Sequence, residues 1–290
     1  SGGIDSTVIT ALTKSLVGNR LRTFSVSFDD AEFDESRYQQ EAVAYLDTQH
    51  SDVRCRADDI GRIFPDVIRH TEQPIVRTAP APLFLLSSLV RESGYKVVLT
   101  GEGADEVFGG YDIFKETKIR RFWRAQPDSR LRPLLLKRLY PYLPRIQSQS
   151  TAYLKAFFNP GLDQREPGPF FSHQPRWDMT SSVKLFLSPA VRAEINSNNA
   201  VAALERRLPA DYRRWNWLEQ AQYLEAAYLL PGYILSSQGD RVVMAHSVEA
   251  RFPFLDHRVV EFASRLPASL KLKVLNEKYL LKRCADGLIP

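Results

Sequence analysis

The sequence predicts an α/β fold, in which a parallel sheet with helices on both faces is followed by an all-helical C-terminal lobe. Strand-like and helix-like segments alternate over residues 1–110. One of them, residues 96–100, is a short apolar run between two glycines, which is typical of a buried strand. From residue 181 to the end there is no convincing strand pattern, and helical patterns dominate. We therefore divide the chain into an α/β part, residues 1–112, and a mainly helical part, residues 113–290.

The elements of the first part each have their own signal. Gly18 and Asn19 end the first helix. β-Branched and aromatic residues predict the first strand, and Pro80 and Pro82 precede an apolar run, which is typical of a helix start. The predicted elements are, in chain order, a helix over 5–17, a strand over 21–28, a helix over 34–46, a strand over 51–55, a helix over 58–70, a helix from 80 and a strand over 96–100. In such a sheet, ligands bind at the carboxyl ends of the strands.

The second part starts with a basic stretch. Residues 117–146 contain nine Lys or Arg and one acid, Asp128, with aromatic residues between them. A nucleic-acid groove would need this mixture. We favour a solvated helix pair with its aromatic residues packed inward, in part because Pro133, Pro141 and Pro144 break the run. Further along, we expect a loop over 159–177 and a helix over 215–230.

Composition limits the class of protein. The 290 residues are 44% hydrophobic and carry a net charge of +5, so a sizeable core is expected and a small anionic ligand is favoured over nucleic acid. No apolar run is long enough to cross a bilayer. Cys55 and Cys284 lack the spacing of a zinc site, and two reduced thiols fit a cytoplasmic protein. We expect neither nucleic acid nor membrane as a partner.

The first seven residues, SGGIDST, have the composition of a loop that receives a polyphosphate. Gly2 and Gly3 allow the backbone to close on an anion, and the helix that follows adds N–H groups and the positive end of its dipole. Asp5 would repel phosphate, so its presence is best explained by a Mg²⁺ between the two. Alone, the motif is also compatible with a helix N-cap after a flexible lead-in.

A second unusual loop, TGEGADEVFGGY at 100–111, follows the apolar strand. Four glycines imply close backbone approach, and three acids within five residues repel one another unless a cation joins them. If Asp5 and Asp105 meet at the sheet edge, they form a two-carboxylate Mg²⁺ site that ATP phosphates would complete. An acidic turn that caps a helix is the alternative, but it does not explain Gly-Glu-Gly.

A third cluster mixes charges with apolar residues over 237–256. It predicts a partly buried ion-pair network of Asp240, Arg241, Glu249, Arg251 and Asp256. A structural role and direct substrate contact explain this network equally well. A basic helix over 276–283 follows, in which Lys278 either neutralises charge on a departing pyrophosphate or is an ordinary surface lysine.

Four motifs together give the chain a resemblance to the synthetase domain of glutamine-dependent asparagine synthetases, which are PP-loop ATP pyrophosphatases. They are SGGIDS at 1–6, TGEGADEVFGGY at 100–111, SVEARFPFLD at 247–256 and EKYLL at 277–281. They occur in the family's order and span nearly the whole chain. The resemblance implies that a carboxylate attacks the α-phosphorus of Mg-ATP to give an acyl-adenylate, for example β-aspartyl-AMP, and that ammonia then displaces AMP to form an amide.

The resemblance also implies roles for individual residues. Asp5 and Asp105 would bind Mg²⁺, Glu102 would act in adenylate formation and in the amine step, and Lys278 would stabilise charge on the phosphates. The pyrophosphate would be held by Ser1, Gly2, Gly3, Asp5 and Ser6. The nucleotide would lie along Val26, Thr100 and Gly101. Substrate contacts would come from Arg77, Thr78, Arg241, Glu249 and Arg251.

Two departures from the family concern the partners and the acceptor. Family members begin with a glutaminase domain, and a strand should precede the first loop. We therefore expect both upstream in a longer parent protein. A homodimer of that protein is also compatible with the sequence. Some members carry Thr-Thr-x-Arg where this chain has Ile75-Val76-Arg77-Thr78, with the arginine shifted by one. The acceptor is therefore aspartate or another carboxylate, as in β-lactam synthetases and lasso-peptide cyclases.

Two other classes compete with this interpretation. A tRNA-modifying PP-loop protein would have paired cysteines and a larger basic surface. A non-catalytic binding module would be expected to lack Asp5, Glu102 or Asp105, and all three are present.

Overall fold

The computed structural model describes residues 2–75, 77–162, 166–197 and 199–290. The chain forms two compact units, which are described separately. The first unit comprises Ser1–Phe108, Glu225–Lys271 and Lys278–Pro290, and the second comprises Gly109–Leu224 and Leu272–Glu277.

The strands of the first unit are parallel, as predicted. β1 (Arg22–Phe28) pairs with β2 (Gln49–Cys55) in a register that sets Phe28 opposite Cys55. β3 (Val97–Leu99) pairs with β4 (Glu249–Arg251). The described strands thus form two two-stranded sheets rather than one continuous sheet.

β4 corrects the prediction that no strand occurs after residue 181. Its three residues are too few to show a period of two, so no local signal predicts it. The strand forms because the amide of Glu249 donates to the carbonyl of Lys96 (2.7 Å) and the amide of Thr100 donates to the carbonyl of Arg251 (3.0 Å). A segment from late in the chain thereby supports the start of the loop at 100–105.

The prediction that the strand over 96–100 is buried was also wrong. Val98 packs in an apolar core, but Val97 and Leu99 are 39% and 46% exposed. Successive side chains of a strand point to opposite faces, so only one face of β3 is covered.

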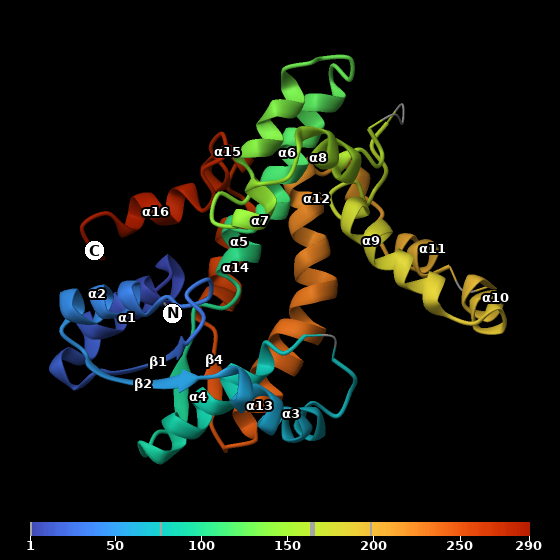
Figure 1. Cartoon of the computed structure of the whole chain (residues 1–290). Helices are drawn as coiled ribbons and strands as arrows, with labels where there is room; N and C mark the ends of the chain where they lie inside the picture. The colour runs from blue at the N-terminus through green and yellow to red at the C-terminus, as the bar shows by residue number, and fades with distance from the viewer. Residues whose placement is uncertain (1, 76, 163–165, 198) are drawn as a thin grey trace. The chain divides into compact units, whose positions relative to one another are not determined.

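Helices lie on both sides of β1 and β2 (Figure 1). α1 (Ile4–Val17) and α2 (Ser36–Leu46) are on one side and α4 (Pro80–Glu92) is on the other. Gly18 ends α1 with φ = 66°, and α4 starts with proline in its first turn, as the sequence predicts. The remaining helices of this unit are α3 (Ala57–Thr71), α5 (Ala104–Phe108), α13 (Arg241–Met244), α14 (His257–Ser264), α15 (Ala268–Lys271), α16 (Tyr279–Ala285) and the short 3₁₀ turns η1 (Gly18–Arg20) and η6 (Pro253–Leu255).

Two apolar cores hold the first unit together. One joins α1, α5, α14 and α16 through residues such as Val8, Phe108 and Leu281. The other joins α3, α4 and α13 through Val67, Val90 and others, and Phe24, Val98 and Ala250 of the strands pack against it. The first core therefore anchors the two glycine-rich loops, and the second core anchors the strands.

The helix predicted over 215–230 consists of two segments with different hydrogen bonding. α12 (Trp217–Leu224) is an α-helix, and η5 (Glu225–Asp240) continues it with the wider i→i+5 pattern of a π-helix. Such segments occur mostly as single turns, frequently at functional sites. η5 extends ten residues beyond the predicted end, to Asp240.

Within the residues that the structure describes, the regular elements of the second unit are α-helices and 3₁₀ turns, joined by loops and by an isolated β-bridge between Lys273 and Asn276. Its elements are α6 (Asp112–Arg124), η2 (Arg132–Arg138), α7 (Pro144–Gln147), α8 (Thr151–Phe158), α9 (Gln174–Ser181), η3 (Ser182–Phe186), α10 (Pro189–Ser197), α11 (Ala200–Glu205), η4 (Tyr212–Arg214) and α12. Its core contains Trp123, Leu136, Leu154 and Phe171. α9 already begins at Gln174, inside the predicted loop.

The basic stretch is only partly the inward-packed helix pair that we predicted. α6 ends at Arg124, and the 3₁₀ turns of η2 follow it with Pro133 in their first turn, where a missing amide is tolerated. Trp123 is buried, but Phe122 and Tyr142 are 47% and 63% exposed.

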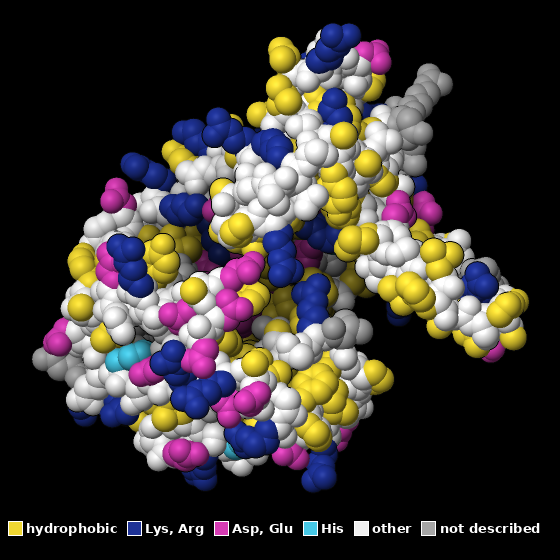
Figure 2. Space-filling view, viewed as in Figure 1, with side chains coloured by type: hydrophobic (Ala, Val, Ile, Leu, Met, Phe, Trp, Pro, Cys, Tyr) yellow, Lys and Arg dark blue, Asp and Glu magenta, His cyan; other side chains and the backbone are white. Residues whose placement is uncertain are grey.

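Apolar side chains are exposed further along this unit. Met179, Leu185 and Phe186 are 56%, 71% and 90% exposed, and Figure 2 shows yellow surface over α9–α11. None of the described helices has the length and apolarity needed to span a membrane.

Candidate active site

The first glycine loop leads directly into α1. The amide of Thr7 donates to the carbonyl of Gly3 (3.2 Å), and the hydroxyls of Ser6 and Thr7 also donate to this carbonyl (3.2 and 2.8 Å). A Cβ on Gly2 would lie 2.4 Å from Cβ of Tyr38, so only glycine fits there. Ser1 lies outside the described residues. Gly2 is therefore required by its close packing on α2, and the closure of this loop on an anion stays a prediction.

The second glycine loop lies against the first. A Cβ on Gly101 would lie 2.8 Å from both the Cβ of Asp5 and the amide nitrogen of Ser6. Gly103 has φ = 89°, and a Cβ there would lie 2.3 Å from Cδ2 of Leu255. The Gly-Glu-Gly sequence is thus explained by close contacts on both sides of Glu102, which a simple acidic turn would not require.

The ammonium of Lys278 lies between the two loops. Its Nζ is 2.5 Å from Oδ2 of Asp5 and 2.7 Å from Oδ1 of Asp105. Lys278 is 8% exposed and has φ = 50°, which places it before α16 rather than inside the predicted basic helix. Lys278 is consequently a buried component of the site, and the surface-lysine alternative is wrong.

Burial shifts the protonation of the acids. Burial raises the pKa of Asp5 by more than the ammonium of Lys278 lowers it. Burial also raises the pKa of Glu102, and the charges of Asp105 and Asp5 raise it further. For Lys278, burial lowers the pKa, but the two carboxylates more than compensate, so its pKa is raised and it stays charged. The site is therefore a cluster of three acids around one fixed cation.

The two aspartates fit a role as magnesium ligands. Oδ1 of Asp5 is buried without a hydrogen-bond partner among the described residues, so it is available to a cation. Carboxylate oxygens are hard donors, and Mg²⁺ is usually bound through one or two of them together with phosphates and water. The described part of the chain contains no group of three or more His, Cys, Asp or Glu side chains that could hold a metal ion.

A cavity of about 1350 Å³ opens beside these loops and reaches the carboxyl ends of β1 and β2. Glu102 lines it, as do Val26, Arg77 and Thr78 from the predicted site. Apolar residues of α3 and α4 form much of its wall, including Ile60, Phe64, Leu83 and Leu86. Its size and position suit a nucleotide together with a second substrate.

Several lining residues did not appear in the sequence prediction. The cavity is also lined by Gln39, Arg56 and Gln238. The side-chain amide of Gln39 donates to the backbone carbonyl of Val26 (3.0 Å). Arg56 follows the last residue of β2 directly. The rule that ligands bind at the carboxyl ends of parallel strands could have identified it, whereas no local signal points to Gln238.

The predicted ion-pair network over 240–256 does not form. Arg241 pairs with Glu72 (2.6 Å), Glu249 with Arg251 (2.7 Å) and Asp256 with Arg258 (2.9 Å), each at a partly or largely exposed position. Residues two apart on a strand share a face, so Glu249 pairs locally with Arg251. Asp256 caps α14 instead.

The apolar residues of this cluster make the contacts that matter to the site. Leu255 packs on Gly103, and the ring of Phe254 meets that of Phe108 edge-on at 5.9 Å. The segment supports the acidic loop, and Arg241, Glu249 and Arg251 are not among the residues that line the cavity.

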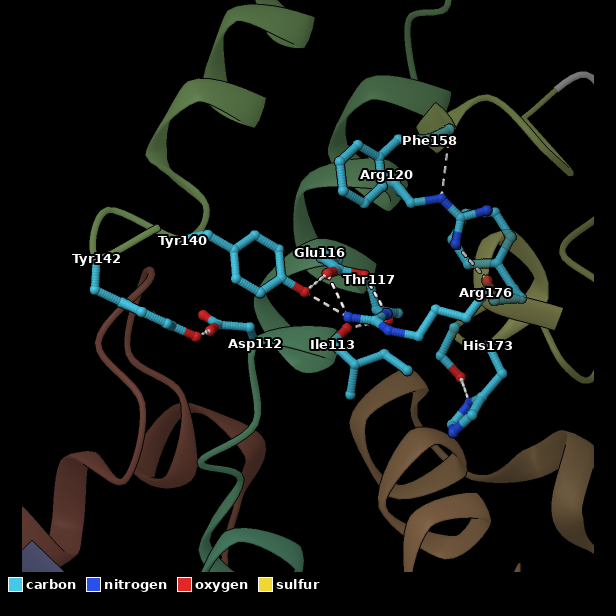
Figure 3. Close-up of polar contacts among 12 residues, drawn as sticks. Asp112, Ile113, Glu116, Thr117, Arg120, Tyr140, Tyr142, Phe158, His173 and Arg176 are labelled. Atoms are coloured by element: carbon cyan, nitrogen blue, oxygen red, sulfur yellow. Dashed lines mark hydrogen bonds and ion pairs between the residues drawn. The ribbon is translucent and has the colours of Figure 1, made fainter. Parts of the chain in front are cut away.

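Charged residues of the second unit are engaged within that unit (Figure 3). Arg120 is fully buried and donates to the carbonyls of Phe158, Pro160 and Phe171. Arg176 makes two bonds to the carboxylate of Glu116 (2.5 and 2.7 Å), which also accepts from the hydroxyl of Tyr140. Arg120 and Tyr140, two residues of the basic stretch, thus stabilise the unit itself.

Known proteins resemble this chain over its whole length. The family model described as asparagine synthase matches residues 1–290. A putative glutamine-hydrolysing asparagine synthetase of Mycobacterium tuberculosis (strain H37Rv) is 30% identical over the whole chain, which spans 42% of that protein. Asparagine synthetase 1 of Bacillus subtilis is 28% identical over the whole chain (43% of its length), and the amidase chyE of Penicillium rubens is 28% identical over 97% of it (45% of its length). The chain thus spans less than half the length of these relatives. Its full-length match to the family model, with both glycine-rich loops in place around Lys278, shows that the chain belongs to the asparagine synthase family.

Proposed function

We propose that the chain is the ATP-dependent, amide-forming part of a glutamine-dependent asparagine synthetase. The observation that carries the proposal is the convergence of Asp5 and Asp105 on the ammonium of Lys278, between two glycine loops at the edge of a large cavity. Opposite charges at this density suit the binding and expulsion of pyrophosphate. The reaction would join aspartate and ammonia through β-aspartyl-AMP, with release of pyrophosphate and AMP.

The first step is the attack of the acceptor carboxylate on the α-phosphorus of ATP. The loop of Ser1, Gly2, Gly3 and Ser6 would hold the β- and γ-phosphates, and Val26, Thr100 and Gly101 would lie along the nucleotide. Asp5 and Asp105 would hold Mg²⁺, which would supply positive charge to the phosphates when bound. Lys278, kept protonated by its neighbours, would stabilise the charge that develops on the departing pyrophosphate.

The second step is the attack of ammonia on the acyl-adenylate. Glu102 lines the cavity, and its raised pKa makes its carboxylate a stronger base than an ordinary glutamate. It is suited to accept the proton that the attacking amine gives up as AMP leaves. The remaining rate acceleration of this step would come from positioning of the two reactants, because the adenylate is already activated.

Arg77 and Thr78 are assigned to acceptor binding because both line the cavity with Glu102. Arg77 forms no ion pair with a residue that the structure describes, so its charge is available for a carboxylate of the acceptor. Arg241, Glu249 and Arg251, which we also predicted to contact substrate, would support the site through the ion pairs described above.

The ammonia would come from glutamine, hydrolysed by a further domain of a longer protein. The bacterial relatives are named glutamine-hydrolysing synthetases, and this chain spans only 42–43% of their length. Free ammonia should replace glutamine in an assay.

Pyrophosphate release by the full parent protein tests the proposal. With Mg-ATP, ammonia and L-aspartate, release should depend on aspartate, and Asp105→Asn should abolish it. Asp66→Asn, on the exposed side of α3, is the matched control and should keep full activity. If the protein binds ATP but releases no pyrophosphate with any carboxylate, the proposal is wrong and the chain is a binding module.

A second candidate is the same chemistry on a different carboxylate. Two fungal relatives, chyE and chry2 of Gibberella zeae, are named amidases and are 28% and 26% identical over 97% and 100% of the chain. The apolar cavity wall of Ile60, Phe64 and Leu83 also suits an acceptor with an apolar body. Pyrophosphate release with apolar carboxylic acids, and none with aspartate, would establish this alternative.

A further inference from the structure

The segment between α3 and α4 carries the proposed acceptor residues, and its described residues, 72–75 and 77–79, belong to no helix or strand. α3 ends at Thr71, Glu72 adopts a left-handed backbone (φ = 54°), and α4 begins at Pro80. A segment of this kind needs contacts from elsewhere to fix its side chains. Those contacts come from η5.

Three contacts connect this segment to η5 and the residue after it. Glu72 accepts from Arg241 (2.6 Å). The side-chain amide of Gln73 donates to the hydroxyl of Ser237. The guanidinium carbon of Arg77 lies 5.6 Å from the ring centroid of Tyr233. The last of these contacts acts directly on a residue of the cavity wall.

Tyr233 is suited to orient Arg77. A guanidinium is attracted to the face of an aromatic ring, most strongly where water is excluded, and stacking leaves its edge free for a carboxylate. The hydroxyl of Tyr233 is buried and has no hydrogen-bond partner among the described residues. Its ring, rather than its hydroxyl, therefore makes the contact.

We propose that Tyr233 of η5 is a positioning residue for Arg77: its ring orients the guanidinium that binds the acceptor carboxylate. This rests on the proposed function, in which Arg77 binds the acceptor. Tyr233 does not line the cavity, so it acts only through Arg77. It should affect the affinity for acceptor and leave the affinity for ATP unchanged.

Steady-state kinetics of five variants of the full parent protein, one of them a double variant, test this. Tyr233→Leu should raise the acceptor KM about 3–10-fold, the value expected for a loss of about 0.7–1.4 kcal/mol, with the ATP KM and kcat unchanged. Tyr233→Phe keeps the ring and should keep the wild-type acceptor KM. In an Arg77→Ala background, Tyr233→Leu should have no further effect. Tyr95→Leu, an aromatic residue that packs on Phe24 outside the cavity lining, is the control and should change neither KM.

A crystal structure of the Tyr233→Leu variant gives a second measurement that does not depend on activity. The guanidinium of Arg77 should leave its wild-type position while the backbone of 72–75 stays in place. The inference is overturned if Arg77 stays in place, if both KM values rise together, or if the effects of the two substitutions add. An unchanged acceptor KM in Arg77→Ala would instead refute the role of Arg77 in the proposed function.

Discussion

Nζ of Lys278 lies 2.5 Å from Oδ2 of Asp5, although the two residues are 273 positions apart in the sequence. The same ammonium lies 2.7 Å from Asp105. Almost the full length of the chain is therefore needed to assemble one charge cluster. The predictions for Lys278, Gly101 and Glu102 below follow from this arrangement.

Replacement of Lys278 by Met should reduce pyrophosphate release about 10²–10³-fold, because one fixed charge on the transition state is lost. The measurement is kcat with saturating Mg-ATP and acceptor. Lys96→Met, at an exposed position on the same unit, should retain full activity. Equal activity of both variants would contradict the role of Lys278.

Gly101→Ala should reduce kcat/KM for ATP by about 10²-fold, because a misplacement of about 1 Å at a site of this kind has that effect. The new Cβ would lie 2.8 Å from the backbone of Ser6 and displace the first loop. Gly61→Ala in α3 meets no atom within 4 Å, and it should keep activity and gain about 0.5–1 kcal/mol of stability. A Gly101→Ala enzyme with a normal kcat/KM for ATP would contradict this, because it would show that the two loops can separate without loss of catalytic efficiency.

The raised pKa of Glu102 has opposite effects on activity and on stability. If the carboxylate is the base, the acidic limb of the pH–rate profile should lie above the pH expected of an ordinary glutamate, and Glu102→Gln should remove it and lower kcat about 10²-fold.

The stability effect follows from proton linkage. The pKa of Glu102 is higher in the folded than in the unfolded state. The stability that its protonation gives the folded state is therefore complete below the unfolded pKa and is lost as the pH rises through the folded pKa. Glu102→Gln should therefore raise the melting temperature at pH 7 but not at pH 4. Thermal unfolding at both pH values measures this, and a lower melting temperature at pH 7 would contradict it.

Arg120→Met should destabilise the second unit by about 3 kcal/mol or more, because the carbonyls of Phe158, Pro160 and Phe171 lose a buried donor and each orphaned group costs about 1–3 kcal/mol. Burial lowers the pKa of Arg120 to about 10, so it still carries its charge at neutral pH. Arg130→Met, at an exposed position, should change the free energy of unfolding by less than about 0.5 kcal/mol. Denaturant unfolding of the parent protein compares the two.

The local elements and the site's two loops could be predicted from the sequence because their signals act over a few residues. Gly18, Pro80 and the β-branched run over 22–28 fix where elements begin and end. The glycines and acids of the two loops pointed to a shared two-carboxylate site on the condition that Asp5 and Asp105 meet, since parallel strands present their carboxyl ends at one edge.

Other features of the site depended on the tertiary structure. β4 is a three-residue strand with no period of its own, and it exists only because β3 pairs with it. Leu255 fills the space that Gly103 leaves, η5 orders the segment with Arg77, and Lys278 reaches the two aspartates from the far end of the chain. The sequence by itself determined the elements, the loops and the acids of the site, because caps, turns and propensities are local. Only the tertiary structure decided which cation the acids share and what supports them, because those contacts join residues that no local pattern connects.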